Sequence, residues 1–358
     1  QSAATAATNA KRFSVQAYVR NTALAQAFIQ RDPRYVALVI VLHFVMTLVR
    51  NPGLMSAVCS RTTTAMLRKY APPTLQPNIT TEYLYSDYFE HFVHLDSGLE
   101  YYTEGDFSKV LGVDTLDLSK SNVDRVMAWG RSTLESSNES FNVKTLKAGS
   151  EDINPSVVMT EGQRAKFELL FEMTELKPGD KCLEIGFGKC DLMHFLREKG
   201  VVVTGTNLST EQVKQAISQG FDAHVLPFSM TAHAPNGPFD VIITNGSWEH
   251  IKLGKQSDEQ AFLPVIKAIA QLLKPGGRWL TTTLHMSMPS DADGFLWGKH
   301  LTLNDIMMAM LLYMGNDGGY PSGRDALTNL GKKCGLHVVK QQNRWLDYYI
   351  YSILWFKI

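Results

Sequence analysis

Hydrophobic and polar positions follow two alternating patterns in the second half of the chain. Apolar runs of strand length occur at 181–186, 201–206, 222–226, 239–244 and 278–284. Apolar residues at helical spacing fill the segments before and between them, at 160–176, 190–199, 210–219 and 258–273. Strands that alternate with helices are typical of a parallel sheet with right-handed crossovers. The pattern therefore predicts an α/β fold with a Rossmann-like, doubly wound sheet.

The C-terminal pattern differs, because two apolar runs follow one another without a helix between them. A predicted helix at 323–334 precedes these runs, which lie at 336–343 and 347–357. Both contain the β-branched and aromatic residues that favour strands. They predict an antiparallel hairpin at the edge of the sheet, which brings the sheet to seven strands. A mainly helical insertion is expected at 285–315.

A basic helical extension is predicted for residues 1–79, and a proline-rich linker forms its last part. Within it, the segment 35–49 is apolar on every side and is expected to form a helix of about 22 Å, which is too short to span a bilayer. Such a helix must be buried. Three ways of burying it stay open: the protein's own core, the groove of a partner, or a membrane interface.

Two further parts are predicted along the chain. Residues 80–156 combine an aromatic, acidic segment that would cover an active site with a polar insertion. This insertion, 107–155, is expected at the surface with one short helix at 123–134. Residues 157–358 form the α/β domain.

The net charge of the 358 residues is zero but unevenly spread. Residues 1–81 hold nine Lys or Arg and one acid, a net charge of +8, which leaves −8 for the remainder. Either these are ordinary solvated charges or the basic arm meets an anionic partner. Contact with anionic lipid through residues 1–70 is one such hypothesis. Nucleic acid is not expected, because no aromatic residues interleave with the basic ones.

The N-terminal composition and the cysteines suggest a compartment. The first 31 residues contain four basic residues and no acid, and the chain begins at Gln. This is typical of a mature protein cut from an organellar precursor. A mitochondrial location on the matrix side is therefore expected, either free in the matrix or associated with the inner membrane. The four cysteines are scattered, so neither a disulfide framework nor a metal site is predicted.

A glycine-containing loop marks the candidate site. Residues 181–190 pass from an apolar strand through Gly186-x-Gly188 into a helical pattern. Glycine permits positive φ and a close approach of a ligand to the backbone, and the start of the helix points N–H groups at that ligand. This signal alone fits NAD, FAD or S-adenosylmethionine (SAM) equally well.

Further motifs make the chain resemble the class I SAM-dependent methyltransferases and, within them, the cyclopropane-fatty-acid and mycolic-acid synthases. These motifs are Leu183 to Cys190 in the loop, Val203 to Gln212 after the second strand, and Trp248-Glu249-His250 after the fourth. The resemblance covers about 80–106 and 157–358.

The resemblance implies a set of site residues, with SAM lying across the carboxyl ends of the first two strands. The implied cofactor-binding residues are Glu184, Gly186, Gly188, Asn207, Leu208, Gln212, Ser247 and Trp248. The catalytic candidates are Glu249, His250 and Tyr348. Other roles stay open: Glu184 as a helix cap, Trp248 as core, and His250 as a structural histidine.

The chain also departs from the family's pattern. Cys190 replaces a third glycine, and its side chain is expected to weaken cofactor binding. No acid stands at 226–230 to contact the adenine. Thr103 and Thr282 stand where the family's synthases hold a bicarbonate base with Cys and His. Without that base ring closure is not expected, whereas plain methyl transfer needs mainly alignment.

Two functions follow from these observations. The first is a catalytically degenerate methyltransferase-like protein that is a structural or accessory subunit of a mitochondrial inner-membrane or matrix assembly, such as ATP synthase or a respiratory complex. Its partners would be protein subunits of that complex, and on this interpretation a bound cofactor is not required; if one binds, it is SAM. The alternative is an active SAM-dependent methyltransferase on a lipid or other apolar acceptor.

Overall fold

The computed structural model describes residues 101, 103–135, 143–144, 146, 152–248, 251–252, 256–283 and 321–355. The predicted basic extension, its apolar helix and the insertion at 285–315 lie outside these residues. So do Glu249 and His250.

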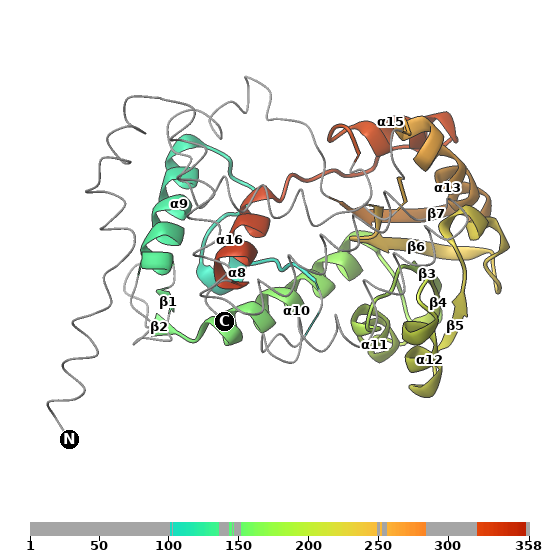
Figure 1. Ribbon diagram of the computed structural model, residues 1–358, viewed down its shortest axis with the longest axis horizontal. Coiled ribbons are helices and arrows are strands. Elements are labelled where there is room, and N and C mark those ends of the chain that lie inside the picture. The colour runs from blue at the N-terminus through green and yellow to red at the C-terminus, as the bar shows by residue number, and fades with distance from the viewer. Residues whose placement is uncertain are drawn as a thin grey trace, which may run out of the picture.

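A five-stranded parallel sheet forms the centre of the described part, in the order β5-β4-β3-β6-β7 (Figure 1). The strands are β3 (Lys181–Ile185), β4 (Val202–Asn207), β5 (Asp222–Val225), β6 (Phe239–Asn245) and β7 (Leu273–Thr282). The chain runs outward from β3 to β5 and then returns to the other side of β3. The order in which the chain adds strands therefore reverses between β3 and β6, while all five strands stay parallel. This confirms the predicted doubly wound α/β fold.

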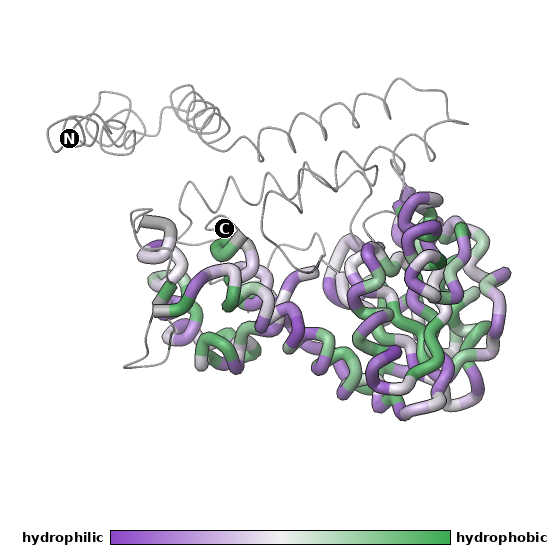
Figure 2. The backbone as a smooth tube through the Cα atoms, turned by 90° about the horizontal axis from the view of Figure 1, so that it is seen from below, coloured by the Kyte–Doolittle hydropathy of each residue, from purple (hydrophilic) through white to green (hydrophobic). Residues whose placement is uncertain are grey.

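Helices cover both faces of the sheet. One hydrophobic cluster lies under α10 (Pro155–Thr174), α11 (Asp191–Glu198) and α12 (Thr210–Ser218), and another lies under α13 (Asp258–Leu272) and α15 (Ala326–Lys333). On β3, Cys182 belongs to the first cluster and Leu183 to the second. Because both faces are covered, buried residues follow one another in β3, β4 and β6 instead of alternating with exposed ones. Figure 2 shows this apolar centre in green.

A second core forms where a polar surface insertion was predicted. The predicted surface position is wrong, whereas the short helix predicted at 123–134 is confirmed. The helices α8 (Ser108–Leu111) and α9 (Lys120–Glu135) and the short strands β1 (Val143–Lys144) and β2 (Asp152–Ile153) pack here. Phe107, Leu111 and Val126 are fully buried in it. The 20-residue helix α10 joins the two parts, with Val158 in the second core and Phe167 under the sheet (Figure 1).

The predicted C-terminal hairpin is also wrong. Residues 336–343 form neither helix nor strand, and residues Trp345–Trp355 form the helix α16. This helix packs against α9 and α10, away from the sheet edge. Its buried residues, Leu346, Asp347, Ile350, Ile353 and Leu354, recur at helical spacing. The backbone N–H of Trp345 is capped by the Asn343 side chain at 3.1 Å. The described part of the sheet therefore has five strands, and two of the seven predicted ones are absent from it.

Candidate functional site

The loop from β3 to α11 has the backbone that a close-approach site requires. Gly186 and Gly188 have φ of +77° and +55°, a region that other residues seldom adopt. The N–H of Gly186 donates to Thr206 O at 2.8 Å, which ties the loop to β4. A Cβ at Gly186 would lie 2.8 Å from Ser247 Cβ. Only glycine therefore fits there without displacing the loop after β6.

Cys190 shares the left-handed conformation but not the freedom of glycine. Its φ is +71°, and it immediately precedes α11. For a residue with a Cβ this conformation costs on the order of 1 kcal/mol. Its side chain is only 1% exposed and packs in the cluster with Leu192 and Phe195. The sulfur thus fills core space, which differs from the expected position against the ligand.

Glu184 is a buried carboxyl group at the end of β3. Its side chain is 2% exposed, and Oε2 has no hydrogen-bond donor among the described residues. Burial, and secondly the neighbouring Asp191, raise the pKa of Glu184 to about 8, although Lys166 opposes the shift. The capping role left open for Glu184 is not seen in the described contacts. A buried acceptor without a donor instead fits a ligand that brings N–H groups.

The predicted adenine and ribose contacts come together at the end of β4. Asn207 Nδ2 donates to Gln212 Oε1 at 2.6 Å, and Asn207 Oδ1 accepts from Ser209 N at 3.2 Å. Ser209 caps α12 by accepting from Gln212 N. Leu208 is half-buried between them. Since β4 adjoins β3, these side chains flank the glycine loop.

The residues predicted after β6 divide between the site and the core. Ser247 Oγ donates to Ile185 O at 3.3 Å and so lies against the loop. Trp248 is fully buried, and its Nε1 donates to the hydroxyl groups of Thr244 and Thr281. Its ring packs edge-on against Phe262. The structure thus places the Trp248 side chain in the core, the alternative left open for it.

A polar network lies over the ends of β6 and β7. Thr103 Oγ1 accepts from Lys166 Nζ at 2.8 Å and from Asn245 Nδ2 at 3.4 Å. Asn245 Oδ1 in turn accepts from Thr282 Oγ1 at 2.8 Å. The two threonines that replace the family's bicarbonate ligands therefore lie in one network, although 179 positions separate them in sequence.

A partly buried ion pair completes this network. Lys166 forms it with Glu104 at 2.5 Å, and the two side chains are 5% and 30% exposed. Burial alone would raise the pKa of Glu104, but the charge and hydrogen bond of Lys166 outweigh it and hold that pKa below its ordinary value. Gln163, one turn earlier on α10, donates to the Tyr101 and Thr103 carbonyls, while its Oε1 has no partner in the described part.

Sequence reasoning omitted Glu104, Gln163, Lys166 and Asn245 from the candidate site. The signal for two of them was present, since Gln163 and Lys166 lie three residues apart on one helix face. Glu104 and Asn245 had no local signal, because the segment before α8 meets β6 only in the folded chain.

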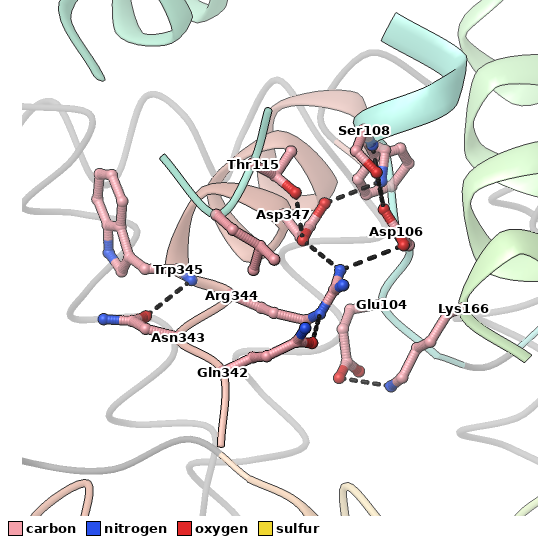
Figure 3. Close-up of polar contacts among 12 residues, drawn as sticks. Glu104, Asp106, Ser108, Thr115, Lys166, Gln342, Asn343, Arg344, Trp345 and Asp347 are labelled. Atoms are coloured by element: carbon pink, nitrogen blue, oxygen red, sulfur yellow. Dashed lines mark hydrogen bonds and ion pairs between the residues drawn. The ribbon is translucent and has the colours of Figure 1, made fainter. Parts of the chain in front are cut away.

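Arg344 and Asp347 hold the same segment from its other side (Figure 3). Arg344 Nη1 contacts Asp347 Oδ2 at 2.8 Å and Asp106 Oδ2 at 3.3 Å. Ser108 Oγ donates to Asp106 in turn. Tyr348, the third catalytic candidate, follows Asp347 on α16, and its ring lies 6.0 Å from that of Tyr351.

The described residues offer neither a membrane-spanning helix nor a metal site. No helix among them is long and apolar enough to cross a membrane. Likewise, the described side chains of His, Cys, Asp and Glu do not gather into a group of three or more that could hold a metal ion.

Comparison with known proteins decides the family. The model of the family "Mycolic acid cyclopropane synthetase" matches residues 152–357, more than half of the chain. The chain belongs to this family. The matched region begins three residues before α10 and includes the whole sheet, the glycine loop and α16. It confirms the resemblance stated from the motifs.

Individual relatives match over shorter stretches. A probable fatty acid methyltransferase of Mycobacterium tuberculosis is 31% identical over 104 residues, 27% of this chain and 24% of the relative. The cyclopropane-fatty-acyl-phospholipid synthase of Escherichia coli K12 is 32% identical over 129 residues, 35% of this chain and 32% of the relative. The chain thus matches only a quarter to a third of the length of these relatives.

Two solved structures align with a larger share of the chain. The cyclopropane synthase MmaA2 of Mycobacterium tuberculosis is 20% identical, with a TM-score of 0.46 over 70% of this chain and 82% of that one. The mycolic acid cyclopropane synthase CmaA1, solved in complex with SAH and CTAB, is 19% identical, with a TM-score of 0.45 over the same shares.

Proposed function

We propose that this protein is a SAM-dependent methyltransferase that acts on a lipid or another apolar acceptor. The observation that supports it best is the pairing of the glycine loop with Glu184. The loop has two glycines at positive φ, and among the described residues the nearby carboxyl group of Glu184 has no donor for Oε2. Family membership and the lipid names of two relatives support the same function.

The residues present fit SAM. The glycine loop admits a ligand to the backbone, Glu184 offers an acceptor to its ammonium group, and Asn207 lies at the end of β4, where ribose is bound in sheets of this type. The apparent defect at Cys190 is weaker than expected, because that side chain is buried in the core. When bound, SAM supplies an electrophilic methyl group.

The polar network would prepare the acceptor for that methyl group. Glu104 is held ionised by Lys166 and is 30% exposed, so a carboxylate oxygen can accept the proton that a hydroxyl or amine acceptor loses. Thr103 and Asn245 fix the segment that carries Glu104 above the sheet. Ring closure is not proposed, since Thr103 and Thr282 supply neither the Cys nor the His of the bicarbonate site.

The interpretation as an accessory subunit of a mitochondrial assembly stays a prediction. Its arguments from composition concern residues 1–79, which lie outside the described residues. Its argument from damaged motifs is weakened at Cys190, whereas the missing acid at 226–230 and the replaced bicarbonate ligands still support it.

Calorimetry with SAM tests the proposed function. We expect the natural chain to bind SAM and Gly186→Ala to lose binding, because its Cβ would collide with Ser247. Gly179→Ala is the matched control: Gly179 also has positive φ, +89°, but a Cβ there meets nothing within 4 Å, and it lies in the turn before β3. Equal binding by Gly186→Ala and Gly179→Ala would contradict the assigned site.

Transfer is measured separately with SAM labelled at its methyl carbon and a total lipid extract. Label in the organic phase that disappears with Gly186→Ala supports the methyltransferase. Binding of SAM without labelled lipid would show a cofactor site without the proposed acceptor class, and absence of SAM binding by the natural chain would overturn the proposal.

A further inference from the structure

We infer that Glu184 holds a proton when no cofactor is bound and releases it when a cationic ammonium group binds beside it. This inference rests on the proposed function and adds a property to it: cofactor affinity in this chain is linked to pH through one buried carboxyl group.

Among the described residues, one oxygen of this buried carboxyl group has no donor that would stabilise the ionised form. The side chain is 2% exposed, and Glu184 Oε2 and Gln163 Oε1 are the two buried side-chain polar atoms in the described part that have no hydrogen-bond partner. An ionised carboxylate without donors or water is strongly disfavoured in a protein interior, so the group takes up a proton instead.

Of the charges around Glu184, Asp191 adds to the effect of burial and Lys166 opposes it. Asp191, the first residue of α11, adds a second negative charge, and Cys182 on the same strand is a buried thiol whose own pKa is raised, first by burial and then by Glu184. Lys166 on α10 is the nearby cation, but its Nζ already contacts Glu104 and the hydroxyl of Thr103. Its charge is therefore shared with another carboxylate.

A bound ammonium group would reverse this balance. It brings both N–H donors and a full positive charge to a carboxyl group that lacks them, which favours the ionised form. The proton of Glu184 then passes to solvent. Affinity for the cofactor should rise about tenfold per pH unit below the pKa of about 8. Since α-amino groups themselves titrate at about 7.7–8.0, affinity should be highest near pH 8.

The released proton can be counted directly. Calorimetry of the full chain with SAM at pH 7, in two buffers of different ionisation enthalpy, should show net release of about 0.8 proton per SAM bound. Glu184 releases about 0.9 proton, the protonated fraction of a group with a pKa of about 8, and the α-amino group of SAM takes up about 0.1–0.2 proton to bind as ammonium. Glu184→Gln should release none and bind at least tenfold more weakly. Glu198→Gln, an exposed carboxyl at the other end of α11, should match the natural chain.

A second measurement does not depend on cofactor. Infrared difference spectra of the ligand-free chain against Glu184→Gln should show a protonated carboxyl band at pH 7 that is lost by pH 9.5. If Glu184→Gln fails to fold, Asp191→Asn serves instead, since it removes a negative charge and should lower proton release at pH 7.

The outcomes separate the two proposals. SAM binding without extra proton release, or an ionised Glu184 at pH 7 in the ligand-free chain, overturns the proton linkage and leaves the methyltransferase intact. A natural chain that binds no SAM between pH 6 and 9 overturns both.

Discussion

Asp347 Oδ1 accepts a hydrogen bond from the backbone N–H of Phe107 at 2.8 Å, across 240 positions of sequence. Its other oxygen accepts from Thr115 Oγ1 and from Arg344 (Figure 3). One buried carboxylate on α16 therefore fixes the segment that carries Thr103 and Glu104 over the sheet. The second core is thus connected to the candidate site through this segment and through α10.

Replacing Asp347 by Ala should destabilise the protein by about 3 kcal/mol. The change leaves the buried N–H of Phe107 without an acceptor and Arg344 without its nearer carboxylate. Chemical denaturation measures the loss. Asp117→Ala is the control, because Asp117 is exposed and its carboxylate accepts hydrogen bonds from the backbone N–H and the hydroxyl of nearby Ser119. A loss below about 1 kcal/mol for Asp347→Ala would show that this carboxylate does not hold the segment.

The same residue predicts a pH dependence of opposite sign to an ordinary salt bridge. Burial raises the pKa of Asp347 to about 6, although Phe107 N–H and Arg344 oppose the shift. Because the folded state holds this proton more tightly than the unfolded state, the contribution of Asp347 is largest below pH 4 and is lost as pH rises through 6. Between pH 4 and 7 the natural chain should lose about 2 kcal/mol relative to Asp347→Asn. Denaturation of both proteins across this range measures the difference, and a constant difference would contradict the raised pKa.

The sheet and the glycine loop could be predicted from sequence because their signals are local. A short apolar run that passes into Gly186 and then into helical spacing specifies β3, its loop and α11 without reference to the rest of the chain. The helix caps at Ser209 and Ser257 are local as well.

The second core could not be predicted in the same way. Its apolar residues before α9 are sparse, and the helix that covers them lies more than 200 positions later. The strand prediction for 347–357 followed β-propensity, which burial overrides, whereas the spacing of Leu346, Ile350 and Leu354 indicated a helix. The contacts of Thr103 with Asn245 likewise depend on long-range folding.

Truncating α16 residues tests that helix directly. Ile350→Ala should cost about 2–5 kcal/mol, since Ile350 is fully buried in the second core. Val339→Ala should cost little, because Val339 is 86% exposed. Ile350 and Val339 lie in the two runs that were predicted to form a hairpin at the sheet edge. In such a hairpin the two substitutions would lower the free energy of unfolding by similar amounts. Thermal or chemical denaturation of the two variants thus distinguishes the helix from the hairpin.

Cys190 allows the cost of a left-handed residue to be separated from the loss of a buried side chain. Cys190→Ala keeps the positive φ and removes the sulfur, so it should destabilise the protein by about 1 kcal/mol. Cys190→Gly loses the whole side chain but relieves the backbone, and should be more stable than Cys190→Ala by about 1 kcal/mol. Denaturation measures this order. SAM affinity should change less than about threefold in both variants, because the sulfur packs in the core. A gain of tenfold or more in Cys190→Gly alone would show that the side chain does obstruct the cofactor.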